Sequence, residues 1–138
     1  IVKFSRGNLG KALKLAASDD FSTMISDILF LLKNIKKMPL EDMLSSIDTV
    51  KSYSFDTGEV LDFIQMWYRD VLLFKAVADV NLLVFNDEYA AISDLASQSE
   101  FNGIERIIRA IDVARRRLEA NVNYDLTMEL LLLVIKEN

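Results

Sequence analysis

The 138-residue sequence contains no histidine and no cysteine. Histidine is the side chain that titrates nearest neutral pH and the commonest transition-metal ligand, and cysteine supplies thiolate nucleophiles, disulfides and metal ligands. Their absence excludes catalytic triads, zinc sites and redox motifs that depend on either residue. We therefore expect no catalytic residue, no cofactor and no metal in this chain, and we expect that it is not an enzyme by itself.

Proline and glycine are also scarce, with one proline and four glycines. Sandwiches and barrels need such residues at their hairpins, so their scarcity favours helices. No apolar run, Leu130 to Ile135 included, approaches the ~20 residues that span a bilayer, so no membrane partner is expected. The absence of cysteine fits a reducing, cytoplasmic location. The net charge of −5 gives no general attraction to nucleic acid.

Apolar residues make up 51% of the chain and recur at helical spacing almost throughout. This pattern predicts an all-α fold, a helical bundle of about six to seven helices. The expected helices span roughly residues 8–17, 20–37, 39–53, 57–77, 86–96, 102–118 and 123–135. The length fits one domain, and the only boundary we predict lies around residues 18–20.

The ends of these helices are predicted from residues that favour N-terminal positions. Asn86 and Asn102 are the expected N-caps of the fifth and sixth helices, and Asn123 or Asp125 begins the seventh. Pro39 fits the first turn of the third helix, because its fixed backbone angle suits that position.

The fourth predicted helix is apolar on more than one side, which is typical of a central helix. We expect Trp67 and Tyr68 to lie in the core. Arg69 and Asp70 interrupt this apolar stretch, and a buried charge must be paired. These residues predict a structural polar network, whose proposed members are Arg69, Asp70, Asn121 and Glu129.

The sixth predicted helix carries a possible basic contact face, formed by Arg106, Arg109, Arg115, Arg116 and Arg117. Such residues could contact a phosphate backbone or an acidic partner. Consecutive positions on a helix point about 100° apart, so the arginine triplet cannot form one stripe. Acidic residues also stand at spacings that allow pairing within the helix: Glu105, Asp112 and Glu119. A solvated, paired face is therefore favoured, and no sequence-specific contact with nucleic acid is expected.

Two motifs carry a resemblance to a known family. The first reads Trp67-Tyr68-Arg69-Asp70-Val71-Leu72-Leu73-Phe74-Lys75 and resembles the Trp/Phe-Tyr/Phe-Arg-Asp-Leu-Leu pattern in C-terminal domains of bacterial DNA polymerase III delta prime subunits. The second, Arg117-Leu118-Glu119-Ala120-Asn121-Val122-Asn123 followed by Leu126 and Glu129, is similar to the ending of that family. There a helix closes with Leu-x-x-Asn-x-Asn, and the last helix begins around a Leu-x-x-Glu motif. The resemblance covers most of the chain after Phe55.

The N-terminal residues resemble the last part of the lid domain of a clamp-loader AAA+ module, and read Phe4-Ser5-Arg6-Gly7-Asn8-Leu9-Gly10-Lys11-Ala12-Leu13. In gamma or tau subunits this segment reads Gly-Ser-x-Arg-Asp-Ala-Leu, and its arginine senses ATP phosphate. Gly10 stands at that arginine position, and glycine has no side chain to reach a phosphate. The resemblance thus implies a subunit that does not hydrolyse ATP, with residues 1–18 as a lid remnant and 19–138 as a C-terminal helical collar domain.

This resemblance implies a non-catalytic oligomerisation domain in bacterial DNA replication. Its expected partners are the collar domains of gamma/tau and delta subunits, which together hold the pentameric loader that places the sliding clamp on DNA. The fourth and seventh predicted helices are the candidates for the subunit interfaces. Three alternatives stay open: a C-terminal fragment of a gamma/tau-type ATPase subunit, a helical nucleic-acid-binding domain that uses the arginines, and a self-associating scaffold unrelated to replication.

Overall fold

The computed structural model describes residues 19–52 and 57–138, and within these ranges it contains six α-helices and no strand. The elements are α2 (Asp19–Asn34), α3 (Leu40–Lys51), α4 (Thr57–Val77), η1 (Val80–Leu82), η2 (Asn86–Glu88), α5 (Tyr89–Gln98), α6 (Phe101–Glu119) and α7 (Tyr124–Glu137). The predicted all-α bundle is confirmed. The helix expected over residues 8–17 lies outside the described residues.

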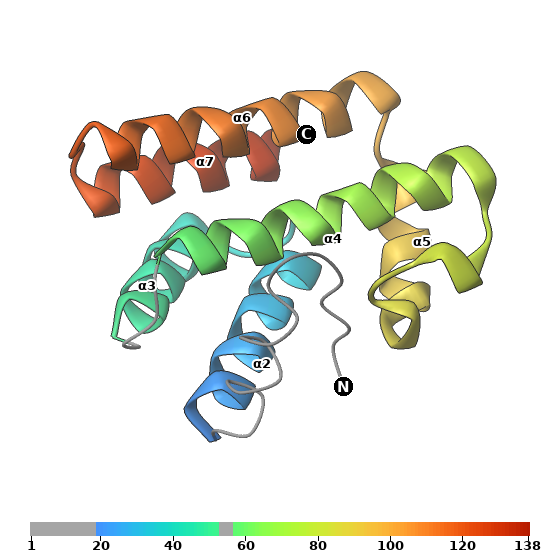
Figure 1. Cartoon of the computed structure of the whole chain (residues 1–138), viewed down its shortest axis with the longest axis horizontal. Coiled ribbons are helices and arrows are strands. Elements are labelled where there is room, and N and C mark those ends of the chain that lie inside the picture. Colours follow the sequence, from blue (N-terminus) through green and yellow to red (C-terminus); the bar gives the residue numbers. More distant parts are fainter. Residues whose placement is uncertain (1–18, 53–56) are drawn as a thin grey trace.

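Helix α4 is the centre of the bundle, and it contacts both α5 and α6. Figure 1 shows α6 and α7 side by side above α4, with α2 and α3 beneath its first half and α5 beneath its last turns. Helix α3 packs against α2 and α7, and so joins the two sides. Because neighbours surround α4, apolar residues are needed on most of its circumference, as its sequence predicts.

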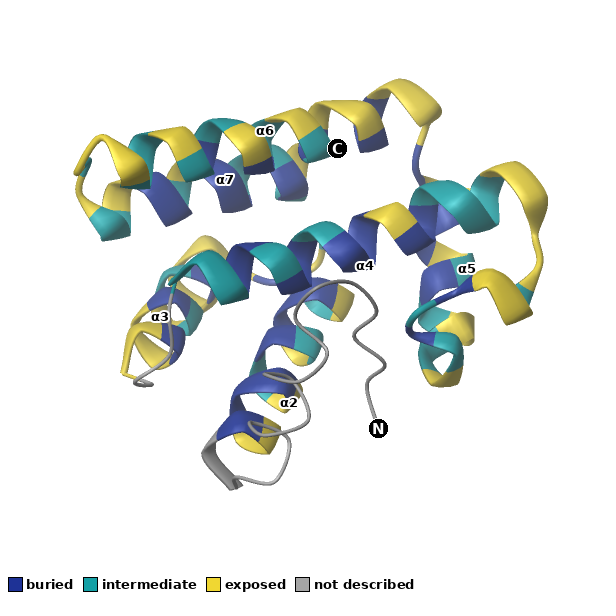
Figure 2. Cartoon of the chain, in the orientation of Figure 1, coloured by how far each residue is buried: buried dark blue, intermediate teal, exposed yellow. Residues whose placement is uncertain are grey.

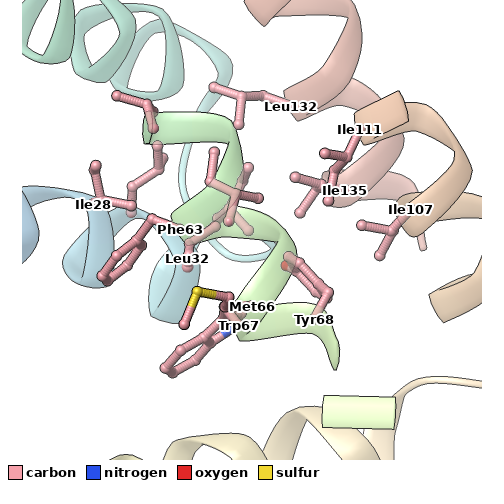
Figure 3. Close-up of a cluster of buried hydrophobic side chains, with 14 of the residues drawn as sticks. Ile28, Leu32, Phe63, Met66, Trp67, Tyr68, Ile107, Ile111, Leu132 and Ile135 are labelled. Carbon is pink, nitrogen blue, oxygen red and sulfur yellow. The ribbon is translucent and has the colours of Figure 1, made fainter. Parts of the chain in front are cut away.

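The core is formed where three helices, α2, α6 and α7, meet around α4. Figure 3 shows its side chains converging from α2 (Ile28, Leu32), α4 (Phe63, Met66, Trp67, Tyr68), α6 (Ile107, Ile111) and α7 (Leu132, Ile135). Trp67 is 0% exposed and Tyr68 is 2% exposed, which confirms the prediction that both belong to the core. Burying such large side chains contributes most of the driving force for folding.

The N-terminus of α7 agrees with its sequence prediction, and that of α6 does not. The side chain of Asn123 accepts a hydrogen bond from the amide of Leu126 at 3.0 Å, so Asn123 is the N-cap of α7. Helix α6 instead begins at Phe101 with Glu100 as its N-cap, which leaves Asn102 inside the first turn. The extended backbone of Glu100 directs its carbonyl to the amide of Ile104 at 3.0 Å, so the helix starts earlier than Asn102 indicates.

Two other predicted starts shift in the structure. Asn86 begins the short turn η2, and α5 starts only at Tyr89. Pro39 occupies the N-cap position of α3 in an extended conformation, and the first helical residue is Leu40. Its carbonyl oxygen accepts the amides of both Asp42 and Met43 at 3.1 Å, which a proline can support without a donor of its own.

Helix α6 and its C-cap Ala120 are followed by Asn121, which lies in the left-handed backbone region at φ 61°. The amide of Asn121 bonds to the carbonyl of Leu118 at 3.1 Å, and that of Val122 bonds to the carbonyl of Arg117 at 2.9 Å. This pair of bonds is a Schellman motif, in which asparagine is one of the few residues that tolerate the required conformation. Asn121 and Asn123 therefore define the short connection between α6 and α7.

A lysine clasp connects α7 to the end of α2. The ammonium of Lys136 donates to the carbonyl oxygen of Ile35 at 3.0 Å and to that of Met38. Carbonyl groups after a helix lack partners within the helix, and a cation is favoured near them. This clasp satisfies two such groups with a side chain from the opposite end of the chain.

The residue that follows α4 has a conformation that is unfavourable for its side chain. Ala78 has φ 59°, and its amide bonds to the carbonyl of Phe74 at 2.8 Å. Because glycine lacks the Cβ atom that is crowded there, Ala78→Gly is expected to raise the free energy of unfolding by about 0.5–1 kcal/mol, measured by urea denaturation. The matched control, Ala76→Gly in the last turn of α4, is expected to lower it by a similar amount. Equal losses in both variants would contradict the left-handed conformation of Ala78.

Candidate functional site

Asp70 is a buried carboxylate that holds the segment between η1 and η2 against α4. It is 3% exposed, and its two oxygens accept the backbone amides of Val84 at 3.1 Å and Phe85 at 2.7 Å. Burial raises the pKa of the Asp70 carboxyl, and the hydrogen bonds from Phe85 and Val84 partly oppose this shift. The carboxylate therefore acts as a structural tether for the connection between α4 and α5.

The predicted polar network around Asp70 has different partners in the structure. Arg69 is exposed, because adjacent helical positions point about 100° apart and Asp70 faces inward. Asn121 closes α6, and Glu129 is half-buried on α7. Within the described residues, the hydrogen bonds of Asp70 go to backbone amides and not to Arg69, Asn121 or Glu129.

Phe85 is the second anchor of the same segment. Its ring lies edge-on to Phe63, with centroids 5.0 Å apart, and edge-on to Trp67 at 5.6 Å. Such edge-to-face pairs add to the stabilisation that comes from area burial alone. The sequence does not predict this anchor, because residues 81–85 form a segment that is too short and too apolar to be assigned to a helix. The signal available was the run of apolar residues that ends at Phe85.

Tyr68 buries a hydroxyl that has no hydrogen-bond partner in the described part of the chain. Because an unpaired buried hydroxyl is destabilising, Tyr68→Phe is expected to leave the free energy of unfolding unchanged or to raise it by up to about 1–2 kcal/mol. Thermal and urea unfolding measure this change. Tyr89→Phe, at an exposed tyrosine, serves as the control with no expected effect. A clear loss of stability in Tyr68→Phe would mean that the hydroxyl has a partner in solution.

The arginines of α6 point in several directions. Three of the five have partners in the structure: Arg115 with Asp62 and Gln65 of α4, Arg109 with Glu105 one turn earlier, and Arg106 with Asn138 at the end of α7. The closest of these ion pairs joins Arg115 to Asp62 at 2.7 Å and links α6 to α4. The remaining two, Arg116 and Arg117, form no ion pair with the described residues. The arginines therefore do not form one continuous basic face.

Helix α7 carries apolar residues on its outward side as well as its buried side. Leu126 is 49% exposed and Leu130 is 37% exposed, one turn further along the helix. Leu133 follows at the next helical repeat and is partly buried. We call these three residues the leucine seam. Spacing of i, i+4 and i+7 is the pattern of a helix face that packs against another helix.

Neither a metal centre nor a membrane span is present in residues 19–52 and 57–138. These residues contain no group of three or more acidic side chains placed to hold a metal ion. Across the same ranges, no helix combines the length and the apolar character needed to cross a bilayer.

Fold and surface together define a small helical-bundle domain with an uncovered leucine seam. Residues 31–137 match the family described as DNA polymerase III, delta subunit, C terminal, and the chain belongs to this family. It is also similar to the DNA polymerase III subunit delta' of Bacillus subtilis (strain 168), at 26% identity over an alignment of 136 residues that covers 94% of this chain. These matches confirm the resemblance to delta prime C-terminal domains that the two motifs indicated.

The chain spans only 40% of the length of this Bacillus subtilis relative. No solved structure matches the chain. The family assignment therefore depends on sequence, and the arrangement of the helices depends on the structure described above.

Proposed function

We propose that this chain is a non-catalytic oligomerisation domain of a clamp-loader subunit in bacterial DNA replication. It packs beside the C-terminal domains of gamma/tau and delta subunits in a collar that holds the pentameric loader. The observation that carries this proposal is the match of residues 31–137 to the family of C-terminal domains of the DNA polymerase III delta subunit. A cytoplasmic location follows from that role.

The chemistry of the described chain supports an architectural role. The sequence has no histidine or cysteine, and the buried carboxylate of Asp70 is bonded to backbone amides of its own chain. The half-buried Arg115 is paired with α4. These polar groups stabilise the bundle, and the leucine seam is an apolar surface that a neighbouring protein of the collar can cover.

The domain organisation is part of the same proposal. Residues 1–18, which lie outside the described residues, form the end of an AAA+ lid, and residues 19–138 form the collar domain. Gly10 replaces the phosphate-sensing arginine of gamma and tau subunits, so this lid end contributes no nucleotide contact. Tight, magnesium-dependent ATP binding and hydrolysis by the intact parent protein, measured by fluorescence titration, would instead favour a gamma/tau-type fragment.

Assembly with a purified partner tests the proposal directly. The chain is co-expressed with the gamma-type subunit of the same organism, and the complex is isolated by affinity and size-exclusion chromatography. We expect both proteins to elute together in a defined ratio. If no complex forms with gamma/tau or with delta, the proposal is overturned. A stable closed homo-oligomer of the chain alone would overturn the proposal as well.

A further inference from the structure

The side of α6 next to α7 carries a row of residues at helical spacing. Arg106 marks this side, because its Nε donates to Oδ1 of Asn138 at the end of α7, at 2.9 Å. Positions four, seven and eleven residues after Arg106 share its face of the helix, and they are Ala110, Val113 and Arg117. We call these four residues the α6 stripe. Ala110 and Val113, in the middle of the stripe, are apolar side chains that are partly exposed.

The α6 stripe and the leucine seam form one surface two helices wide. Helices α6 and α7 lie side by side and run in opposite directions, because Gly103 near the start of α6 approaches Asn138 at the end of α7. Figure 2 shows exposed residues along the side of α6 that points away from α4. The surface therefore has an apolar centre, with Leu126 and Leu130 as its most exposed members, and an arginine of the stripe near each end.

The arginines at the two ends of this surface differ in their partners. At one end Arg106 is bonded to Asn138, and Glu137 lies close to it in the sequence of α7. At the other end Arg117 is half-buried and has no ion pair with the described residues. A half-buried cation without an ion pair favours a carboxylate from a partner, which would be shielded from solvent. Arg117, unlike Arg106, thus has no side-chain partner among the described residues.

We propose that this surface binds an amphipathic α-helix of a neighbouring subunit, with leucine-like residues over the seam and a carboxylate opposite Arg117. A helix is the occupant because the i, i+4, i+7 ridge of the seam fits the groove between side-chain rows of another helix. The charge of Arg117 fixes the end at which the acidic residue of that helix lies. This inference rests on the proposed function, which supplies the neighbouring subunit.

Matched variants of the full chain test the surface against the gamma-type subunit of the same organism. Leu126→Gln combined with Leu130→Gln removes apolar contacts but keeps good helix formers, and Phe30→Gln makes the same kind of change at a 63% exposed residue of α2. Arg117→Glu reverses the charge on the stripe, and Arg116→Glu reverses it one position away on another face. Circular dichroism and thermal unfolding establish that each variant folds.

Dissociation constants from isothermal titration calorimetry give the result. The double leucine variant and Arg117→Glu are each expected to weaken binding by about tenfold or more, and the two controls to change it by less than about twofold. Wild-type affinity in both folded test variants would overturn the surface inference and leave the proposed function standing. No wild-type complex would overturn both. A wild-type homodimer that the leucine variants dissociate would show a second copy as occupant and overturn the proposed partner.

Discussion

Asp70→Ala is expected to lower the free energy of unfolding by about 2–4 kcal/mol. The substitution leaves the amides of Val84 and Phe85 without the carboxylate that accepts them at 3.1 and 2.7 Å. The amide of Phe85 is buried with that carboxylate, so water cannot readily take the place of the lost acceptor. Urea denaturation followed by far-UV circular dichroism measures the loss.

Two variants make this result specific to the carboxylate. Arg69→Ala changes the exposed neighbour and is expected to alter the free energy of unfolding by less than about 0.5 kcal/mol. Asp70→Asn keeps one acceptor oxygen but faces the other amide with a donor, so its loss is expected to be smaller than that of Asp70→Ala. Equal losses of unfolding free energy in Arg69→Ala and Asp70→Ala would contradict the role of the Asp70 carboxylate as a tether.

Phe85→Ala is expected to lower the free energy of unfolding by about 3–5 kcal/mol. Phe85 is buried, and removal of its ring leaves a cavity between Phe63 and Trp67, which contact it edge-on. Because Phe63 and Trp67 lie on the central helix and are held by other contacts, they cannot easily move to fill that space. The measurement is again urea denaturation, and the dependence of the unfolding free energy on urea concentration is compared with that of the wild type to check two-state behaviour.

The matched control for this core substitution is Phe30→Ala. Phe30 is 63% exposed on α2, so its truncation is expected to change the free energy of unfolding by less than about 0.5 kcal/mol. Phe85→Leu retains apolar volume but loses the ring pairs, and an intermediate loss is expected. A Phe85→Ala protein as stable as the wild type would mean that the segment between η1 and η2 does not pack against α4 in solution.

Periodicity predicts the helices well because most of them bury one face against a neighbouring helix. It predicts their starts less well, since asparagine suits several positions near a helix N-terminus. Asn123 is an N-cap, whereas Asn102 lies within the first turn of α6 and Asn86 begins a separate short turn. The choice depends on where neighbouring carbonyl groups lie, which a local pattern does not contain.

The burial of Asp70 could be predicted from its position within an apolar stretch, but its partners could not. They are backbone amides 14 and 15 residues further along, and any sequence can supply such amides. The same limit applies to α6, where spacing predicts the Arg109 pair with Glu105 but not the Arg115 pair with Asp62 of another helix. Periodicity also cannot separate buried from outward-facing apolar residues on α7, whereas the exposures of Leu126 and Leu130 do so.

The lysine clasp has a consequence for the order in which the chain folds. Its bonds join Lys136 to residues 101 and 98 positions earlier, so a long loop must close before they form. The turn between α6 and α7 closes over only a few residues, with Asn121 and Asn123 already suited to it. Local closure is fast and distant closure slow, so we expect the hairpin of α6 and α7 to form early. Docking of α2 onto it would then be a late step, and the first to reverse on unfolding.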